Sequence, residues 1–166
     1  LEAVGEWRAV GRSAITTPRE NVSMSLDWRE SADGYRLDLR GPVGAGSLRL
    51  EGDGDGVVLT ASDGTDERAS DARELLYRQT GMDLPVSVLR WWLRGLPAPE
   101  PEVASQRLDA EGRPERLEQA GWVVEYNGYH ARGGRIAMPV RITLEGPDGV
   151  SVRVHVRDWE THGASI

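Results

Sequence analysis

The sequence predicts a mainly β protein built on an antiparallel sheet, because its hydrophobicity alternates and its turns are regularly spaced. Apolar and polar residues alternate along much of the 166-residue chain, as in NVSMSLDW (21–28), YRLDLR (35–40) and VSVRVHV (150–156). A strand with one buried and one exposed face has this period of two. Segments such as GDGDG (52–56) and GPDG (146–149) separate these stretches and are typical of hairpin turns. We expect ten or eleven strands, enough for a twisted sheet to curl into a barrel or split into a sandwich.

One segment, residues 70–97, breaks the alternation and predicts an inserted helical hairpin. Asp71, with Glu74 three residues later, resembles a capping box, and apolar residues follow at helical spacing as far as Gly81. After Pro85 a second amphipathic stretch predicts another helix. The apolar side of this hairpin has to pack on a surface, and we expect it to cover the open mouth of the curled sheet as a lid.

The amino-terminal residues 1–10, LEAVGEWRAV, predict a short leading helix around Trp7. The Pro-rich segment 97–102 indicates a stiff loop rather than a domain linker, because strand-like residues resume directly after it. At this length we expect a single domain over residues 1–166.

Composition argues against several classes of function. The net charge of −7 comes from 27 acidic and 20 basic residues that are mixed along the chain, whereas a nucleic-acid-binding surface needs concentrated basic residues. The chain has no cysteine for a disulfide or thiolate metal site, and its three histidines lack metal-ligand spacing. No catalytic or phosphate-binding motif stands out, and no apolar run approaches the roughly 18 residues of a membrane-spanning helix. We therefore expect no nucleic-acid partner, metal, cofactor or enzymatic activity.

The apolar faces of the strands remain as the candidate functional feature. An aliphatic, Trp-lined sheet face closed by an amphipathic hairpin is either a packed core or a hydrophobic pocket. The same alternation is expected for both, so the residues alone leave this choice open.

Five segments, taken in order, resemble the LolB family, the outer-membrane lipoprotein receptors of Gram-negative bacteria. The most specific is the part of the third segment that reads TGMDLPVSVLRWWLRGLP, and together the five extend over nearly the whole chain. The segments are GEWRAVGRSA (5–14), YRLDLRGPVG (35–44), ARELLYRQTGMDLPVSVLRWWLRGLP (72–97), GWVVEYNGYH (121–130) and VRVHVRDW (152–159).

The resemblance implies an incomplete antiparallel β-barrel with a helical lid around a hydrophobic cavity. Proteins of this family accept lipoproteins from the periplasmic carrier LolA and place their acyl chains in the inner leaflet of the outer membrane. They are themselves anchored at the periplasmic face of that membrane through an acylated amino-terminal cysteine. The resemblance implies that the native form is lipid-anchored at the periplasmic face of the outer membrane. This chain contains no cysteine and so lacks the anchor residue. We expect this chain to be soluble and to be a monomer.

Candidates for the acyl-chain cavity come from the inward phase of the strands and the apolar side of the hairpin. They are Trp28, Leu37, Leu39, Leu48, Val124, Ile142 and Leu144 on the strands, and Leu75, Leu76, Leu89, Trp92 and Leu93 on the hairpin. Tyr126 and Tyr129 are expected at the rim of this cavity.

The turn GPVGAG (41–46) carries an apolar residue, Val43, that the backbone of a turn does not require. The resemblance implies that the matching family loop presents an exposed leucine to the membrane, and Val43 stands at that position. Pro42 stiffens the turn and Gly44 lets it protrude, so Pro42, Val43 and Gly44 form the expected membrane-insertion loop. Valine in place of leucine removes one methylene, about 0.8 kcal/mol of bilayer affinity.

Two other binding functions remain open from the sequence. One is a lipocalin-like pocket for a free fatty acid or another hydrophobic ligand, with no transfer to a membrane. The other is a soluble, LolA-like lipoprotein shuttle. A lipobox cysteine or a plain signal peptide upstream in the gene would distinguish the receptor from the shuttle.

Overall fold

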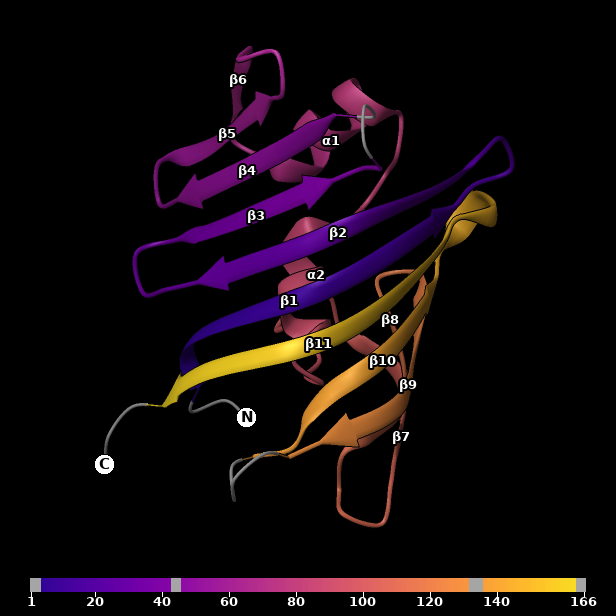
Figure 1. Cartoon of the computed structure of the whole chain (residues 1–166). Helices are drawn as coiled ribbons and strands as arrows, with labels where there is room; N and C mark the ends of the chain where they lie inside the picture. The colour runs from indigo at the N-terminus through magenta and orange to yellow at the C-terminus, as the bar shows by residue number, and fades with distance from the viewer. Residues whose placement is uncertain (1–3, 43–45, 132–135, 164–166) are drawn as a thin grey trace. The chain divides into compact units, whose positions relative to one another are not determined.

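The computed structural model describes residues 4–42, 46–131 and 136–163 and confirms the β-rich fold class (Figure 1). Two helices interrupt a series of eleven strands. The elements are β1 (Val4–Thr16), β2 (Asn21–Glu30), β3 (Tyr35–Arg40), β4 (Ser47–Asp53), β5 (Gly56–Ala61), β6 (Asp66–Ala69), α1 (Ala72–Thr80), α2 (Val86–Trp92), β7 (Val103–Leu108), β8 (Pro114–Gln119), β9 (Trp122–His130), β10 (Met138–Glu145), a 3₁₀ turn (Pro147–Gly149) and β11 (Ser151–Gly163).

All eleven strands belong to one sheet with the order β6-β5-β4-β3-β2-β1-β11-β10-β9-β8-β7. Most neighbours in the sheet are neighbours in sequence, as expected for successive hairpins, whereas β1 pairs with the last strand. Strands β6 and β7 stand at the two ends of this order, so the sheet is not closed into a barrel.

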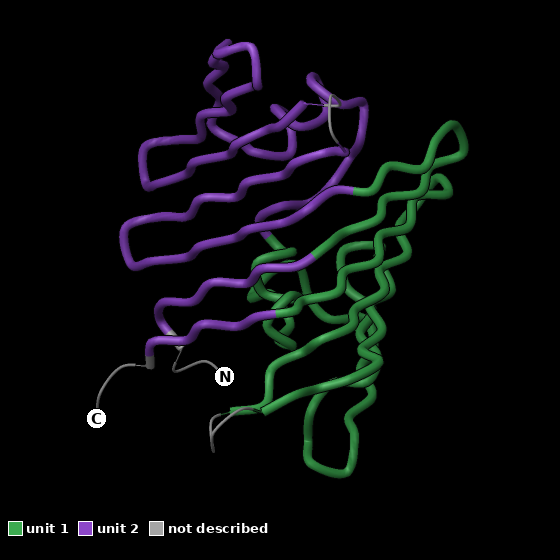
Figure 2. Tube along the Cα trace, viewed as in Figure 1, with its two compact units in different colours: residues 1, 12–23, 88–157 green, residues 2–11, 24–87, 158–166 purple. Residues whose placement is uncertain are grey.

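The chain divides into two compact units, coloured separately in Figure 2. Unit 1 contains residues 12–23 and 88–157, and unit 2 contains residues 2–11, 24–87 and 158–166. The predicted helical hairpin does not belong to one unit, because the boundary falls after Ser87, inside α2.

The predicted leading helix is wrong, because residues 4–16 form strand β1. Its odd-numbered residues from Trp7 to Ile15 are buried, while their even-numbered neighbours are exposed or half-buried. This burial follows a period of two, and β1 takes the central place between β2 and β11. Pairing on both sides satisfies the backbone of this segment in a way that a short isolated helix cannot.

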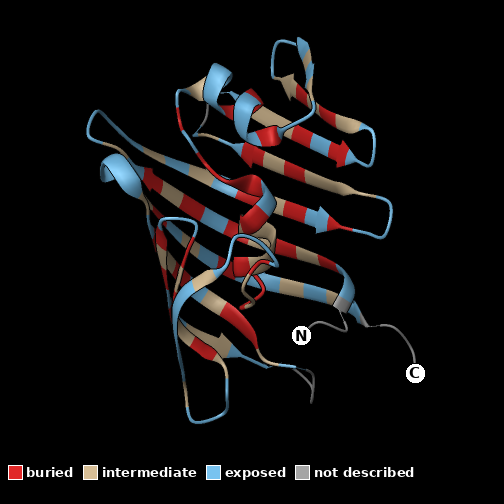
Figure 3. Cartoon of the chain, turned by 180° about the vertical axis from the view of Figure 1, so that it is seen from behind, coloured by how far each residue is buried: buried red, intermediate tan, exposed pale blue. Residues whose placement is uncertain are grey.

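In unit 2 buried residues alternate with more exposed ones along the strands (Figure 3), and apolar residues of neighbouring strands pair with one another. Trp28 of β2 pairs with Leu37 of β3, and Leu39 of β3 pairs with Leu48 of β4. Leu37 also pairs with Leu50 of β4, and Leu50 pairs with Leu59 of β5, which is fully buried. Helix α1 packs on β5 and β6 and lies behind these strands in Figure 1.

Helix α1 begins and ends where the sequence predicts. The side chain of Asp71 caps its amino terminus by accepting a hydrogen bond from the Arg73 backbone N–H at 3.0 Å. At the other end Gly81 has a left-handed φ of 72° and donates its N–H to the Tyr77 carbonyl oxygen at 2.8 Å.

In unit 1, too, apolar side chains of neighbouring strands lie opposite one another and form an apolar face. Val124 of β9 lies between Leu117 of β8 and Leu144 of β10, and all three are buried. Leu144 in turn pairs with Val152 of β11. The buried face of unit 1 thus consists of aliphatic side chains in register across four strands.

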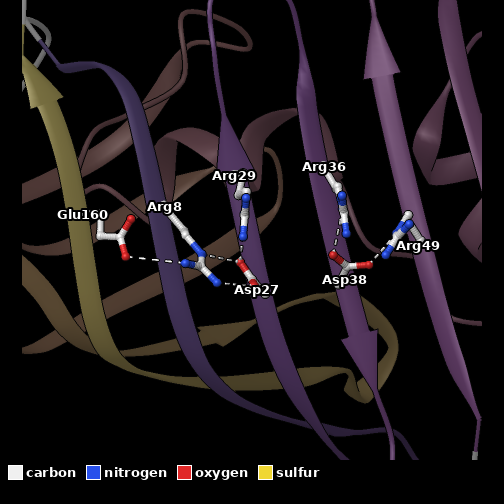
Figure 4. A network of polar contacts seen from close by, with 7 residues as sticks. All are labelled: Arg8, Asp27, Arg29, Arg36, Asp38, Arg49 and Glu160. Carbon is white, nitrogen blue, oxygen red and sulfur yellow. Dashed lines mark hydrogen bonds and ion pairs between the residues drawn. The ribbon is translucent and has the colours of Figure 1, made fainter.

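The opposite face of the unit 2 sheet carries a network of ion pairs (Figure 4). Asp27 and Asp38 lie directly opposite each other on β2 and β3, an arrangement that would repel without nearby cations. Arg8 holds Asp27 with two hydrogen bonds of 2.8 and 3.0 Å, and Asp38 accepts hydrogen bonds from Arg36 at 3.0 Å and Arg49 at 2.7 Å. The arginines therefore allow this charged face to form a regular sheet.

The same arginines lower the pKa of both carboxyl groups. The hydrogen bond from Arg8 lowers the pKa of Asp27 more than burial raises it. Burial alone would raise the pKa of Asp38, but hydrogen bonds from Arg49 and Arg36 lower it overall. A carboxyl group whose pKa is lower in the folded state stabilises the fold above its unfolded pKa of about 3.9 and loses this effect as the pH falls through the folded value.

Replacing Asp27→Asn is expected to lower the free energy of unfolding by about 1 kcal/mol at pH 7, since the arginines around it lose a charged partner. The difference from the parent chain should be smaller at pH 3, which lies below the unfolded pKa of about 3.9, because the stabilisation declines as the pH falls toward the lowered folded pKa. Urea unfolding at the two pH values measures both effects. Asp66→Asn, at an exposed position of β6, is the control and should change stability by less than about 0.5 kcal/mol. An equal loss at both pH values would contradict the role of the carboxylate charge.

Candidate functional site

The twelve predicted acyl-chain residues fall equally into the two units. Unit 2 holds six of them, all on its apolar sheet face or on α1, and unit 1 holds the other six, on its apolar sheet face, on α2 and in the turn after α2. The unit 2 residues are Trp28, Leu37, Leu39, Leu48, Leu75 and Leu76, and the unit 1 residues are Leu89, Trp92, Leu93, Val124, Ile142 and Leu144. Ten are buried, whereas Leu48 and Leu89 are half-buried. Their role as a cavity lining stays a prediction.

Within unit 1, α2 and the loop after it are tied to strand β8 by a buried glutamine. Gln119 is 1% exposed. Its Oε1 accepts hydrogen bonds from Trp92 Nε1 at 2.8 Å and the Ala98 backbone N–H at 2.9 Å. Its Nε2 donates to the carbonyl oxygens of Ala98 at 2.8 Å and Pro101 at 2.6 Å. One side chain therefore satisfies four polar groups around the predicted lid.

The sequence analysis missed Gln119, although a signal was present. Leu117 and Gln119 are two residues apart on β8 and so point to the same face, which is buried. A polar residue on an apolar face needs hydrogen-bond partners, because leaving a buried amide unpaired costs stability.

Tyr126 and Tyr129, predicted at the cavity rim, have different surroundings. Tyr126 is buried and donates its hydroxyl hydrogen to the Trp92 carbonyl oxygen at 2.6 Å. This hydrogen bond attaches the end of α2 to strand β9. Burial raises the pKa of Tyr126 well above its usual value. Tyr129 is half-buried, donates to the Pro114 carbonyl oxygen at 2.6 Å and lies under the guanidinium of Arg113, 4.6 Å from the ring centre.

An aromatic cluster packs in unit 2. The ring of Trp7 lies 5.9 Å from that of Trp28 and 5.6 Å from that of Trp159. Trp28 also contacts Tyr35 at 6.2 Å and donates its indole N–H to the buried carboxylate of Glu30 at 3.2 Å. Burial, with a smaller effect of the charge of Asp71, raises the pKa of Tyr35 to about 12, so this phenol stays neutral at physiological pH.

A broad groove of about 1190 Å³ lies in unit 2, but it is lined by charged side chains. Arg29, Arg36, Glu51, Val58 and Arg68 face it and pair in that order across β2 to β6. None of the twelve predicted acyl-chain residues lines this groove. Trp7, Tyr35 and Val57 also line it, so the groove combines charged side chains with apolar ones.

The neck of the predicted insertion loop is described, but its tip is not. The Gly41 N–H donates to the Gly46 carbonyl oxygen at 3.0 Å and closes the turn between β3 and β4. Pro42 is exposed, whereas Val43 and Gly44 lie outside the described residues. The turn therefore leaves the sheet at a defined place, and its role at a membrane stays a prediction.

Neither described helix is long and apolar enough to span a bilayer. Among residues 4–42, 46–131 and 136–163, no group of three or more histidine or acidic side chains could hold a metal ion.

Comparison with known sequences identifies the family. The chain matches the family described as "Outer membrane lipoprotein LolB" over residues 5–159. An outer-membrane lipoprotein LolB from Alkalilimnicola ehrlichii is 49% identical over 160 residues, which are 96% of this chain and 78% of that protein. Another from Halorhodospira halophila is 40% identical over 93% of this chain and 75% of that protein. The chain belongs to the LolB family.

Solved structures of low sequence identity share the fold of this LolB family member. A putative outer membrane lipoprotein-sorting protein domain from Vibrio parahaemolyticus has a TM-score of 0.62 and 11% identity, with 95% of this chain and 86% of that chain covered. A LolA superfamily protein from Nitrosomonas europaea has a TM-score of 0.57 and 8% identity, with 96% and 87% covered. The family resemblance and the open antiparallel sheet predicted from the sequence are both confirmed.

Gln119 provides a test of how α2 is held in this LolB family member. Gln119→Leu removes four hydrogen bonds from buried or part-buried groups, so we expect a loss of about 3 kcal/mol in the free energy of unfolding. Gln119→Glu keeps the acceptor but places a second carboxylate oxygen against the carbonyl oxygens of Ala98 and Pro101, so at pH 7 it should be at least as destabilising as Gln119→Leu. Urea unfolding followed by Trp fluorescence measures the loss, and hydrogen exchange should increase in residues 92–101.

The matched control is Gln106→Leu at an exposed position of β7 in the same unit, with an expected change under about 0.5 kcal/mol. Equal stability of Gln119→Leu and Gln106→Leu would show that Gln119 does not anchor the segment.

Proposed function

We propose that this chain is a receptor that takes lipoproteins from a LolA-like carrier and inserts their acyl chains into the outer membrane. The observation that carries the proposal is the family match over residues 5–159, at up to 49% identity to outer-membrane lipoproteins LolB. The apolar faces in both units supply the surfaces that such a function needs. The native protein is then an anchored, monomeric, non-catalytic protein of one functional domain at the periplasmic face of the outer membrane.

The free energy of acyl chains explains why a receptor is required. Each methylene moved out of water contributes about 0.8 kcal/mol, so exposing a ~16-carbon chain costs on the order of 12 kcal/mol. A lipoprotein therefore crosses an aqueous space only while its chains are covered. Transfer from carrier to receptor to bilayer needs no nucleotide if each step covers the chains better than the last.

The acyl chains bind, in this proposal, along the twelve residues predicted from the sequence. Leu48 and Leu89 are the two that are half-buried, so a chain reaches them first. The other ten are buried, and a chain has to replace the atoms that cover them. Binding in this manner is weaker than burial in a preformed empty cavity, which favours release to the membrane.

Delivery uses the loop of Pro42, Val43 and Gly44 in this proposal. The hydrogen bond between Gly41 and Gly46 closes the loop neck, so the tip extends from a fixed base at the end of β3. An apolar tip residue lowers the free energy of contact with the hydrocarbon layer, and a charged one raises it.

Acyl-chain binding is tested by titrating a fluorescent C16 fatty acid into the folded chain. Leu48→Asn should weaken the affinity about ten-fold, because it replaces part of an apolar contact by an amide. The matched control is Val58→Asn, since Val58 is also half-buried but lies on the polar face of the neighbouring strand. Equal affinity of both variants and the parent would rule out this face as the binding surface. Competition by a lipoprotein distinguishes the receptor from a lipocalin-like protein that binds only free lipids.

Delivery is tested with Val43→Glu in an assay of labelled lipoprotein moving from a LolA-like carrier into vesicles. We expect the release into vesicles to slow at least ten-fold, because the carboxylate would have to lose its water at the bilayer surface. Uptake from the carrier should be unchanged. Val58→Glu on the polar face of unit 2 serves as the control. Release at the parent rate would remove the loop from the mechanism.

A further inference from the structure

The polar face of unit 2 carries a row of side chains without a carboxylate, at the place where the predicted insertion loop leaves the sheet. Arg40 is the last residue of β3, and its cross-strand partners are Ser25 of β2 and Ser47 of β4. The next residue, Gly41, forms the neck of the loop. One arginine and two hydroxyl groups therefore stand directly beside the base of the loop.

A third hydroxyl group lies against the same base. A Cβ added at Gly46, the other residue of the loop neck, would lie 3.0 Å from the Oγ atom of Ser62 in the turn between β5 and β6. On the other side, the Ser25 hydroxyl donates to the Arg40 carbonyl oxygen at 3.4 Å. All of these residues belong to unit 2. The ends of four strands thus bring one cation and several hydroxyl donors to one edge of the sheet.

The guanidinium of Arg40 is available to a ligand. Arg40 is exposed, and within the part of the chain that the structure describes its side chain makes no hydrogen bond or ion pair. Asp38, two residues earlier on the same face, already accepts hydrogen bonds from two other arginines. Asp63, in the turn between β5 and β6, accepts a backbone hydrogen bond of 2.9 Å within its own turn. Arg40 is therefore an unpaired cation in a chain of net charge −7.

The distance from Arg40 to the expected tip of the loop matches the headgroup layer of a bilayer. Val43 follows Arg40 by three residues, so their Cα atoms are at most about 10 Å apart. The headgroup layer on each side of a bilayer is roughly 5–8 Å thick, because a core of about 30 Å lies within a membrane of about 40–45 Å. If Val43 reaches the edge of the hydrocarbon, the long side chain of Arg40 lies at the level of the lipid phosphate groups.

We propose that Arg40 binds a phospholipid phosphate group when the Val43 loop enters the membrane, and that the serine hydroxyls around the loop base contact the same headgroup layer. Guanidinium and hydroxyl groups both donate hydrogen bonds to phosphate oxygens, and the bond from the charged guanidinium is the stronger one. The contact holds the loop at the depth where Val43 meets the hydrocarbon. It deepens the proposed delivery function, on which it rests.

The first test is sedimentation of the chain with phosphatidylcholine vesicles that contain phosphatidylglycerol. At low salt Arg40→Gln should weaken binding about five-fold, as expected for one basic residue at an anionic surface. The loss should be smaller at moderate salt, which screens the interaction. Arg40→Lys keeps the positive charge and should stay within about two-fold of the parent.

The matched control is Arg68→Gln. Arg68 is exposed on the same polar face of unit 2, but its cross-strand row is the one that contains Arg36, four residues before Arg40. Its removal changes the net charge by the same amount, so binding should change by less than about two-fold if position decides the effect.

The second test is a double-mutant cycle with the loop. In the Val43→Glu background the tip stays out of the hydrocarbon, so Arg40→Gln should weaken vesicle binding by less than about two-fold. In the delivery assay Arg40→Gln alone should slow the release of labelled lipoprotein into the same vesicles about five-fold. Uptake from the LolA-like carrier should be unchanged.

Several results would overturn the inference. Equal vesicle binding by Arg40→Gln and Arg68→Gln is one, and an undiminished loss in the Val43→Glu background is another, because Arg40 would then act without the loop. Slower uptake from the carrier with vesicle binding intact would assign Arg40 to a protein partner. Displacement from the vesicles by inorganic phosphate at constant ionic strength would show a site for a small anion only. Each of these results leaves the proposed function standing if the parent chain delivers lipoprotein and Val43→Glu does not.

Discussion

The central strands of the described sheet have one apolar and one polar face, and this constraint organises the rest of the structure. Because successive side chains point to opposite sides of a sheet, Leu37 and Leu39 face the apolar side while Asp38 between them faces water. In unit 2 the apolar side is covered by α1, and the other side is crossed by arginine–carboxylate pairs. A shift of one residue in strand register would bring charged side chains under the helix. The alternation thus fixes the register and supplies the surface that the proposed function uses.

The sequence predicted the fold class, the helical insert and the family because these depend on local pattern and on motif order. The helix predicted over residues 1–10 around Trp7 is wrong, because residues 4–16 carry the same alternation and form strand β1. Strand β1 forms because β2 and β11 pair with it on its two sides. Strand β11 comes from the other end of the chain, so the local sequence does not reveal this pairing. Contacts between residues far apart in the chain follow from the completed sheet and not from spacing. Examples are Gln119 with Trp92, Arg8 with Asp27 and Arg49 with Asp38.

The predicted lid is better understood as two helices with different attachments. Helix α1 packs on β5 and β6 of unit 2, and it is capped at both ends. The end of α2 is held within unit 1 by Tyr126 and by the Gln119 hydrogen bonds. Movement of α2 away from β8 and β9 would break these buried bonds at once, at a cost of several kcal/mol. Movement of α1 would break mainly apolar contacts, and an acyl chain can form apolar contacts with the same side chains instead.

Moderate affinity for the acyl chain follows from the same packing. A bilayer covers a chain completely, at about 0.8 kcal/mol for each methylene. The side chains of the protein's apolar faces are already buried by other protein atoms. The free energy of binding an acyl chain there is therefore only the difference between the new contacts with the acyl chain and the protein contacts that it displaces. Ten of the twelve candidate residues are in that condition, so the protein covers an acyl chain less favourably than the membrane does. The acyl chain therefore moves toward the bilayer without an energy source, provided that the receptor is held at the membrane surface when its apolar face opens.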